Sequence, residues 1–267
     1  MAFDQHASPG KHAFKNPTRS RDDPVTDHPI PGFPPTPMDI AALRKRSVIF
    51  EALSEEETSA IMQMARMVNH PARHTVFQEG EPGDHLLVVM NGRVKVSLVS
   101  PDGKEAILSI LEAGDMFGEM ALLDGEPRSA TITTMEKSSF LVLWRRDFLP
   151  FLERNPQVAL KLLAALSKRL RATNDMVGSL SFLNLPARLA RILINLGQQY
   201  GKLTGEGIAI GIKLSQEELG NLVGVSRESV NRQIRLWVEA GVLDYTHGTI
   251  ILKNSDVLFR ESLNSDR

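Results

Sequence analysis

Short segments rich in β-branched and large apolar residues alternate with glycine, proline and polar turns between residues 75 and 144. In the segment RVKVSLV, apolar side chains at positions 94, 96 and 98 alternate with polar ones at 93, 95 and 97. A period of two is typical of a half-buried antiparallel strand, and Pro101-Asp102-Gly103 offers a turn into the next strand. The pattern predicts an antiparallel β-roll or barrel of about 70 residues.

The pattern becomes helical after residue 144. A short helix through residues 148–152 is expected to stop at Asn155, and a long helix is expected over residues 157–182. Asn155 is a suitable N-cap for the long helix, and Pro156 stands at its first position, where a missing N–H costs nothing. Ahead of the roll, Ser54 is a suitable N-cap for another helix.

Two interleaved seven-residue series of mostly apolar side chains run along the long helix. They are Ala159, Leu166, Thr173 and Leu180, and Leu163, Leu170 and Val177. Such series are the a and d positions of a coiled-coil seam. A narrow stripe of this kind could instead pack on the β-roll, but its length of roughly 20 residues favours a parallel homodimer.

A hinge and a two-helix motif follow the long helix. Asn184 can cap a helix that has a proline in its first turn, which marks a boundary between domains. Ser215 and Glu218 have the spacing of a capping box, and a Val-Gly-Val turn joins the helix that they open to a second helix over 226–237. This spacing is typical of a helix-turn-helix, and residues 242–252 predict a two-stranded wing around a His-Gly turn.

These elements predict an α+β fold in five parts. They are a Pro-rich tail over 1–38, a β-roll domain over 39–156, a dimerisation helix over 157–183, a winged helix-turn-helix domain over 184–256 and a C-terminal tail over 257–267. The first part holds eight of the fifteen prolines and few large apolar residues, which predicts disorder. Its His6, His12 and His28 could form a metal-binding tail, but their irregular spacing favours a solvated loop.

The composition removes several kinds of chemistry. The 267 residues include no cysteine, which excludes disulfides, thiolate zinc sites and Cys-ligated iron–sulfur clusters. A net charge of −1 does not indicate a nucleic-acid partner, so any DNA binding must depend on local charge. There is no apolar run of the roughly 18 residues that span a membrane and no signal-peptide pattern at the N-terminus, so a cytoplasmic protein is expected. With no Walker loop, HExxH motif, paired carboxylates or Ser/His/Asp grouping, no catalytic residue and no enzyme activity is predicted.

The stretch FGEMALLDGEPRSATI, residues 117–132, carries the most specific chemistry. It resembles the phosphate-binding cassette of cyclic-nucleotide-binding domains. The resemblance implies that Glu119 accepts a hydrogen bond from a ribose 2′-hydroxyl and that Arg128 pairs with the cyclic phosphate. It implies a cradle completed by the Ser129 hydroxyl and by the amides of Gly118, Ser129 and Ala130. The residue types suit these roles, because a guanidinium and N–H groups satisfy an anionic phosphodiester and an ionised carboxylate only accepts. The alternative is that Glu119 and Arg128 form only a surface ion pair joined by a turn.

The long helix resembles that of the CRP/FNR family, in particular its cyclic-AMP receptor branch, where two polar positions contact the base from both subunits. The resemblance implies this role for Thr173 and Asn174. Thr173 keeps the residue type of that branch, whereas Asn174 replaces a serine. Both side chains donate and accept, so they do not separate adenine from guanine. A polar pair that fixes the helix register without touching a ligand is the alternative.

The segment SRESVNR, residues 226–232, resembles the recognition helix of the same family, and the likeness covers about residues 40–255. It implies that Arg227 and Arg232 read guanine O6 and N7 and that Glu228 accepts from a cytosine amine. It also implies a palindromic site with a TGTGA-like half-site, whose central step stays open because Asn231 replaces a glycine of that branch. Ser215 and Ser226 are expected at phosphates, and Ser229 completes the predicted DNA-binding set. A solvated helix face is the alternative.

The resemblance as a whole implies a homodimeric transcription regulator that binds double-stranded DNA, responds to cyclic AMP or cyclic GMP and works with RNA polymerase. It implies no prosthetic group and no metal. A haem sensor would need an axial ligand, for which His70, His74 and His85 are candidates, but ordinary polar roles are favoured for all three. A regulator that binds DNA without ligand, and a cyclic-nucleotide-binding subunit that acts through a protein partner, are the alternatives.

Overall fold

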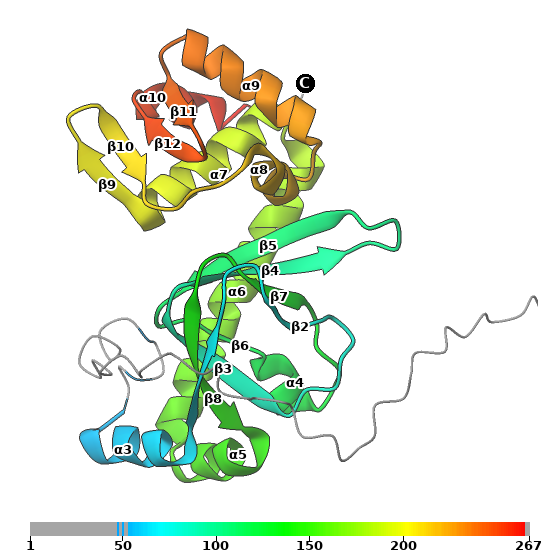
Figure 1. Cartoon of the computed structure of the whole chain (residues 1–267), viewed down its shortest axis with the longest axis vertical. Helices are drawn as coiled ribbons and strands as arrows, with labels where there is room; N and C mark the ends of the chain where they lie inside the picture. The colour runs from blue at the N-terminus through cyan, green and yellow to red at the C-terminus, as the bar shows by residue number, and fades with distance from the viewer. Residues whose placement is uncertain (1–46, 48–49, 51–52, 265–267) are drawn as a thin grey trace, which may run out of the picture.

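The computed structural model describes Ser47, Phe50 and residues 53–264 of the chain. The predicted tail over 1–38, with its three histidines, lies outside the described residues. A β-roll, a long helix along one side of it and a C-terminal domain at the end of that helix make up the described part (Figure 1). Within this part, no helix is both long enough and apolar enough to cross a bilayer.

Two four-stranded antiparallel sheets form the roll. Their strand orders are β1-β8-β3-β6 and β2-β7-β4-β5. The strands are β1 (Arg66–His70), β2 (Thr75–Phe77), β3 (His85–Asn91), β4 (Arg93–Val99), β5 (Glu105–Glu112), β6 (Met116–Phe117), β7 (Thr131–Thr134) and β8 (Ser138–Trp144). The roll predicted for residues 75–144 is confirmed, and β1 adds a strand ahead of it.

The central strands β3 and β8 are buried on both faces. Between the sheets, Phe117 and Phe140 meet edge to face with ring centroids 5.4 Å apart. The other face of β3 and β8 packs against α3 (Glu55–Met64), α5 (Arg145–Arg154) and the start of α6 (Pro156–Phe182). Burial on both faces explains why these two strands are continuous apolar runs, unlike the alternating β4.

The predicted helix caps differ in outcome. Ser54 caps α3, since its hydroxyl accepts from the Glu57 N–H at 3.1 Å and the Glu57 carboxylate accepts from the Ser54 N–H at 2.8 Å. Asn155 occupies the N-cap position of α6 as predicted, but its side chain makes no capping hydrogen bond. The Asn155 side-chain amide instead donates to the Phe151 carbonyl at 2.8 Å, because the last turn of α5 leaves free carbonyls beside it. Pro156 begins α6 as predicted.

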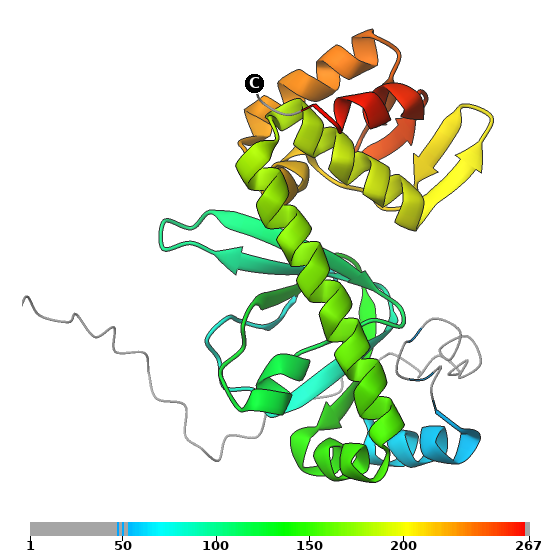
Figure 2. The ribbon, with the colours of Figure 1, turned by 180° about the vertical axis from the view of Figure 1, so that it is seen from behind.

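Helix α6 runs along the roll and presents its outer face away from it (Figure 2). Val158 and Leu162 are buried against the roll, and Leu166 of the predicted seam is half-buried there. The seam residues Leu163, Leu170, Val177 and Leu180 are 42–63% exposed. Packing of the seam on the roll, the alternative to a dimer, therefore holds only for Ala159 and Leu166 of the two series.

The C-terminal domain is a winged helix-turn-helix. Its elements are α7 (Leu185–Tyr200), β9 (Gly201–Thr204), β10 (Gly207–Ile210), α8 (Gln216–Val223), α9 (Arg227–Glu239), β11 (Leu243–Thr246), β12 (Thr249–Leu252) and α10 (Ser255–Glu261). The Asn184 side chain caps α7 as predicted, accepting from the Ala187 N–H at 3.0 Å. The sheet has the order β11-β12-β10-β9, so it contains four strands where the sequence predicted two.

Helix α10 corrects the predicted domain boundary. The sequence predicts a tail over residues 257–267, but Leu258 of α10 is fully buried in the core of the C-terminal domain. The Asn254 side chain caps this helix by accepting from the Val257 N–H at 3.2 Å. The domain therefore extends at least to Glu261.

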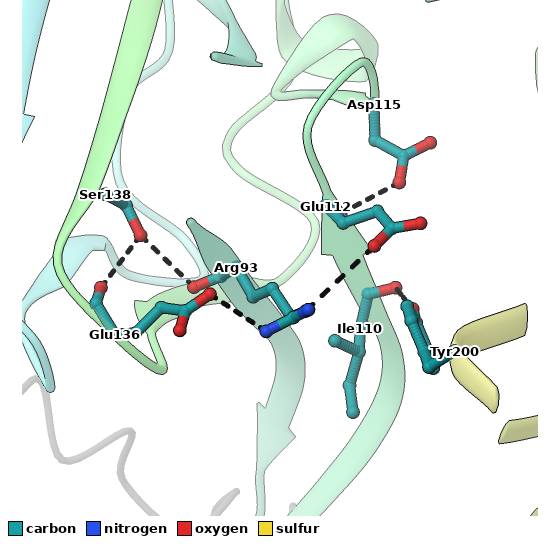
Figure 3. Close-up of polar contacts among 7 residues, drawn as sticks. All are labelled: Arg93, Ile110, Glu112, Asp115, Glu136, Ser138 and Tyr200. Atoms are coloured by element: carbon teal, nitrogen blue, oxygen red, sulfur yellow. Dashed lines mark hydrogen bonds and ion pairs between the residues drawn. The ribbon is translucent and has the colours of Figure 1, made fainter. Parts of the chain in front are cut away.

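Strand β5 carries the contact between the roll and the C-terminal domain. Ile110 belongs to the same buried cluster as the core of that domain. The Tyr200 hydroxyl donates to the Ile110 carbonyl at 3.2 Å, and Arg93, between Glu112 and Glu136, places its guanidinium carbon 5.8 Å from the centre of the Tyr200 ring (Figure 3). Burial raises the pKa of Tyr200, which keeps the hydroxyl a donor.

A polar contact links the same two parts at the other end of β5. Glu105 accepts from Lys95 Nζ at 2.6 Å and from Asn221 Nδ2 of α8 at 3.0 Å. Burial acts to raise the pKa of Glu105, but these donors outweigh it and hold the pKa below its usual value. The carboxylate thus ties α8 to the β4–β5 hairpin.

Candidate functional site

The predicted phosphate cassette forms a sharp turn after β6. Gly118 has a φ of +79°, in the left-handed region that favours glycine, and α4 (Glu119–Asp124) begins at the next residue. The chain then returns through residues 125–130 to β7. This geometry sets the start of α4 and the segment around Arg128 side by side.

Arg128 is only 3% exposed, and its contacts fix the guanidinium in place. Nη1 donates to the carbonyls of His85 at 2.8 Å and Gly118 at 3.0 Å, and Nη2 lies 3.2 Å from His85 Nε2. The guanidinium carbon stands 4.1 Å from the centre of the Phe77 ring. Among the described residues, Arg128 Nε has no hydrogen-bond partner.

Two glycines make room for this guanidinium. A Cβ at Gly118 would lie 2.5 Å from Arg128 Nη1, and a Cβ at Gly83 would lie 2.6 Å from Arg128 Nε. Because both distances are far inside van der Waals contact, any larger residue would displace the guanidinium. Gly83 was not predicted, since it lies in a turn outside the cassette.

Glu119 is likewise 3% exposed and is held by the long helix. Arg169 of α6 donates to Glu119 Oε1 at 2.7 Å and also to the Met116 carbonyl. Glu119 Oε2 is buried without a hydrogen-bond partner in the described part of the chain. Arg169 was not predicted from the sequence, although its position one helical turn before Thr173 places it on the same face of α6.

A cavity of about 340 Å³ lies between the cassette, the β4–β5 hairpin and α6. Six of the seven predicted ligand-binding residues line it: Gly118, Glu119, Arg128, Ser129, Ala130 and Thr173. Its walls also include Arg169 and apolar side chains such as Val96, Leu98 and Leu111. Asn174 does not line this cavity and is exposed on α6.

The polar groups of the cavity suit an anion that carries a sugar hydroxyl. Burial lowers the pKa of Arg128, against the charges of nearby carboxylates, but an arginine stays cationic. Donors and acceptors buried without partners cost stability, so a ligand that satisfies them gains affinity. A cyclic phosphodiester would satisfy Arg128, and a ribose hydroxyl would satisfy Glu119 Oε2. The residues present therefore fit a cyclic nucleotide.

The three histidines considered as haem ligands lie in different places. The rings of His70 and His74 stack with centroids 4.5 Å apart, and neither residue lines the cavity. His85 contacts Arg128 and, through Nδ1, Asp84 Oδ1 at 3.0 Å. The ordinary polar role expected for His85 is therefore incomplete, because this residue also contacts Arg128 of the cassette.

A second cavity of about 490 Å³ lies between β5, α6, α7 and α8. It shares Leu108, Ser109 and Ala172 with the first cavity. Val96 pairs with Ser109 and the next residue pairs with Ile107, so Leu108 is the extra residue of a β-bulge. The two cavities therefore share part of one wall.

The helix-turn-helix is built as predicted. Ser215 and Glu218 form the capping box of α8, and the Ser226 hydroxyl accepts from the Ser229 N–H at 3.3 Å to cap α9. Gly224 ends α8 with a φ of +71°. The apolar face of α9 is buried in the domain core, so its opposite face is left for another molecule.

The outer face of α9 carries the predicted DNA-reading side chains. Arg227, Glu228 and Arg232 are exposed, while Ser229 and Asn231 are half-buried. Gln216 Nε2 donates to Asn231 Oδ1 at 3.2 Å, which orients the Asn231 amide. A backbone hydrogen bond and the Ser226 hydroxyl hold the pKa of Glu228 below its usual value. The face offers guanidinium donors and a carboxylate acceptor, which match major-groove base edges.

Ser215 and Arg227 also line a polar cleft of about 940 Å³ between the C-terminal domain and the roll. Arg73, Lys95 and Thr133 stand on the roll side of this cleft. In this arrangement the start of α9 faces the roll of its own chain.

Two family models match the chain in succession. Residues 67–155 match the cyclic nucleotide-binding domain, and residues 187–260 match the Crp-like helix-turn-helix domain. The two matches cover the roll with α5, and the C-terminal domain through most of α10. The first match contains the cassette that lines the cavity, and the second contains α9 with the outer face described above.

Known proteins resemble two thirds or more of the chain. The CRP-like cAMP-activated global transcriptional regulator of Mycobacterium tuberculosis is 33% identical over 217 residues, which are 81% of this chain and 97% of the relative. The cAMP-activated global transcriptional regulator CRP of Escherichia coli is 32% identical over 184 residues, 68% of this chain and 87% of the relative. The c-di-GMP responsive global regulator CLP of Xanthomonas campestris has a similar structure, with a TM-score of 0.68 and 24% identity over 74% of this chain and 99% of CLP. At that identity the last similarity shows the fold alone.

Proposed function

The chain belongs to the CRP/FNR family of cyclic-nucleotide-binding transcription regulators, and from this premise we propose that cyclic AMP switches it between two forms. In the proposed mechanism the nucleotide enters the cavity of the β-roll. A homodimer with bound nucleotide then recognises a palindromic DNA site and works with RNA polymerase.

The arrangement of Arg128 and Glu119 in one cavity wall is the observation that carries the proposal. Each is 3% exposed, and each keeps one polar atom without a partner among the described residues. In the proposed complex Arg128 pairs with the cyclic phosphate and Glu119 accepts from the ribose 2′-hydroxyl. The Ser129 hydroxyl and the amides of Gly118, Ser129 and Ala130 complete the phosphate contacts.

The choice of cyclic AMP follows the relatives, because the regulators from both organisms are described as cAMP-activated. Thr173 lines the cavity, and its hydroxyl donates to the Arg169 carbonyl at 3.0 Å, so it can still accept from an exocyclic amine. Asn174 lies outside this cavity, and in the proposal it reaches the base bound by the second subunit. That assignment requires a dimer along α6.

The dimer and the reading helix define the DNA site. The exposed seam of α6 supports a parallel pairing of two chains, which would place two copies of α9 one DNA turn apart, about 34 Å. Arg227 and Arg232 would then read guanines and Glu228 a cytosine in each TGTGA-like half-site. Ser215 and Ser226 would contact phosphates, with Ser229 and Asn231 at the same surface.

The proposed switch moves the C-terminal domain relative to the roll. Arg227 is exposed but lines the cleft beside the roll of its own chain, and in the proposal DNA binding opens this cleft. Contact of the nucleotide with both the cassette and α6 would favour the open form through the hinge at Asn184. This coupling works only if the nucleotide binds the DNA-competent form more tightly.

Titration calorimetry with cyclic AMP and cyclic GMP tests the ligand, and a gel-shift assay with each nucleotide tests the coupling. We expect cyclic AMP to bind and to strengthen binding to a palindromic site. Tighter binding of cyclic GMP would change the assigned effector, and DNA binding that is equal with and without either nucleotide would contradict the switch.

Replacement of Arg128 by alanine tests the phosphate contact. The loss of a buried charge-assisted fork is expected to cost about 2–4 kcal/mol of nucleotide affinity, measured by the same calorimetry. Arg146→Ala is the control, since Arg146 is an exposed arginine that contacts Asp147 at 3.5 Å. Nucleotide-stimulated DNA binding that survives in Arg128→Ala would contradict the proposal.

A regulatory subunit that acts through a protein partner is the second candidate, because a helix-turn-helix can also serve as an interaction module. The salt dependence of DNA binding separates the two. Phosphate contacts release counterions, so a regulator that binds DNA loses affinity steeply as salt increases. Weak binding that is indifferent to salt would favour the protein partner.

A further inference from the structure

We propose that His85 is a positioning residue for Arg128, whose neutral imidazole holds the guanidinium in place for the phosphate, and that protonation of His85 weakens nucleotide binding as the pH falls. The inference rests on the proposed function, because it concerns the same phosphate contact. It adds a residue outside the cassette and a dependence on pH that the cassette residues alone do not provide.

The hydrogen bonds of His85 define its tautomer. A guanidinium can only donate, so at 3.2 Å from Arg128 Nη2 the His85 Nε2 atom must accept. The proton of a neutral ring then sits on Nδ1, which donates to Asp84 Oδ1 at 3.0 Å. The chain Asp84, His85 and Arg128 is therefore complete only while the imidazole is neutral.

The surroundings of His85 keep the ring in this orientation. Its side chain is 17% exposed, and the ring packs against Trp144, with centroids 4.9 Å apart. His85 and Trp144 are paired residues of β3 and β8, the central strands of one sheet. A ring held this way cannot swing out to solvent without disturbing the strand pair.

His85 also holds Arg128 through its backbone carbonyl. Because this contact does not depend on the side chain, the contribution of the imidazole ring can be tested by substitution. The His85 carbonyl accepts from Arg128 Nη1 at 2.8 Å whatever the side chain is. A substitution at position 85 therefore leaves the carbonyl anchor in place, while the side-chain contacts with Nη2 and with Asp84 are changed. Without the hydrogen bond at Nη2, the guanidinium stays buried but can rotate about its remaining bonds.

Protonation would reverse the interaction at Nη2. A protonated ring places an N–H where the acceptor was, so two donors and two positive charges face each other across about 3 Å. Trp144 does not titrate, and Asp84 favours the imidazolium only weakly because its side chain is 70% exposed. Glu81 and Glu119 act on the guanidinium as further negative charges.

The direction of the pH effect depends on which protonation state of His85 binds the nucleotide. Histidine has an ordinary pKa of about 6.5, so lowering the pH from neutral favours the imidazolium. A cyclic phosphodiester keeps its single charge throughout. If only the neutral ring orients Arg128, affinity is full at high pH and falls as the ring is protonated, and binding to a partly protonated ring releases protons.

The experiment compares the full-length protein with two variants, using titration calorimetry with cyclic AMP at about pH 8 and about pH 5.5. In His85→Gln the amide oxygen can replace Nε2 as acceptor and does not titrate. In His85→Phe the ring remains to pack on Trp144 but accepts no hydrogen bond. His70→Gln is the matched control. Like His85, His70 is a half-buried histidine of the roll that does not itself line the cavity, and its ring stacks on His74.

We expect the wild type and His70→Gln to bind more weakly at the lower pH and to release protons on binding there. His85→Gln should bind like the wild type at pH 8 and lose the pH dependence, and His85→Phe should bind about tenfold more weakly at both. A His85→Gln profile that follows the wild type, or a wild-type affinity that rises on acidification, would overturn the inference. A wild type that binds neither cyclic nucleotide at pH 8 would instead contradict the proposed function.

Discussion

The space around the Arg128 guanidinium is so tight that single atoms decide its position. We expect Gly118→Ala to weaken cyclic-nucleotide binding at least tenfold, because its Cβ would lie 2.5 Å from Arg128 Nη1 and push the guanidinium away from its carbonyl anchors. Calorimetry with cyclic AMP measures this loss.

The matched control is Gly103→Ala. Gly103 has a φ of +81°, close to that of Gly118, and a Cβ there would meet no atom within 4 Å in the described structure. Both variants carry the backbone cost of a left-handed alanine, about 1 kcal/mol, but only Gly118→Ala moves Arg128. Equal nucleotide affinity in the two variants would show that the glycine serves the turn alone.

On the reading face, Arg227 is expected to determine one base. Its replacement by alanine should cost about 1–3 kcal/mol on the cognate half-site and relax the preference for guanine at one position. Binding to a set of half-sites with single base changes measures both effects. A uniform loss across all sites would instead make Arg227 a phosphate contact.

Single residues could be predicted from the sequence where they share one contiguous motif. The cassette and the recognition helix are such motifs, and the cassette residues line one cavity. Arg169, Gly83 and His85 reach the same site from other elements, because the roll and α6 fold around it. The spacing of Arg169 one helical turn before Thr173 is the one signal along the chain for these three residues, and the contacts of Gly83 and His85 with Arg128 are revealed only by the folded structure.

Among the elements, helix α6 makes the clearest prediction about assembly. Leu170 lies on the seam and is 63% exposed, so Leu170→Asp would place a charge in the middle of the proposed dimer contact. We expect this variant to be monomeric and to lose specific DNA binding. Sedimentation velocity measures the mass, and circular dichroism checks that the fold is kept.

Leu160 offers a control on the same helix. It is 67% exposed but does not belong to either seven-residue series, so Leu160→Asp should leave the mass unchanged. A dimer that dissociates in both variants would point to a wider contact than the seam. A dimer that persists in Leu170→Asp would exclude this face as the interface.

Long, strongly patterned elements were predicted well, and among the short strands the wing of β11 and β12 was predicted but β9 and β10 were not. The long helix and the alternating strand β4 carry many repeats of one period, which makes their type clear. Strands β9 and β10 have four residues each, and β9 is exposed throughout, so they show no period. Asn155 has the right residue type for a cap, but its amide is taken by α5, a choice that depends on tertiary geometry.

In the whole molecule, the contact between Asn221 and Glu105 holds the C-terminal domain on the roll. We expect Asn221→Ala to loosen this arrangement and to raise DNA binding without nucleotide about two- to tenfold, since one hydrogen bond to a charged group is worth about 1.5–3 kcal/mol at most. A gel-shift assay without nucleotide measures the change.

Lys104→Ala is the control for this contact. Lys104 lies at the tip of the same hairpin, where it pairs with Asp102 at 2.8 Å, and its side chain is 84% exposed. Its removal should leave nucleotide-free DNA binding as it is. Lower binding in Asn221→Ala would mean that the contact belongs to the DNA-competent form rather than to the closed one.

Because the bulge at Leu108 lies between the two cavities, the shape of the ligand's base is expected to affect the C-terminal domain separately from the phosphate contact. Leu108, Ser109 and Ala172 line both cavities, and the other walls of the second cavity include α7 and α8, so a base that displaces one of these side chains also alters the wall of the second cavity. Two nucleotides with the same phosphate and sugar contacts can therefore bind equally well and still differ in how far they drive the C-terminal domain. The thickness of the base, rather than the strength with which the phosphate is held, would then grade the response from full to partial activation.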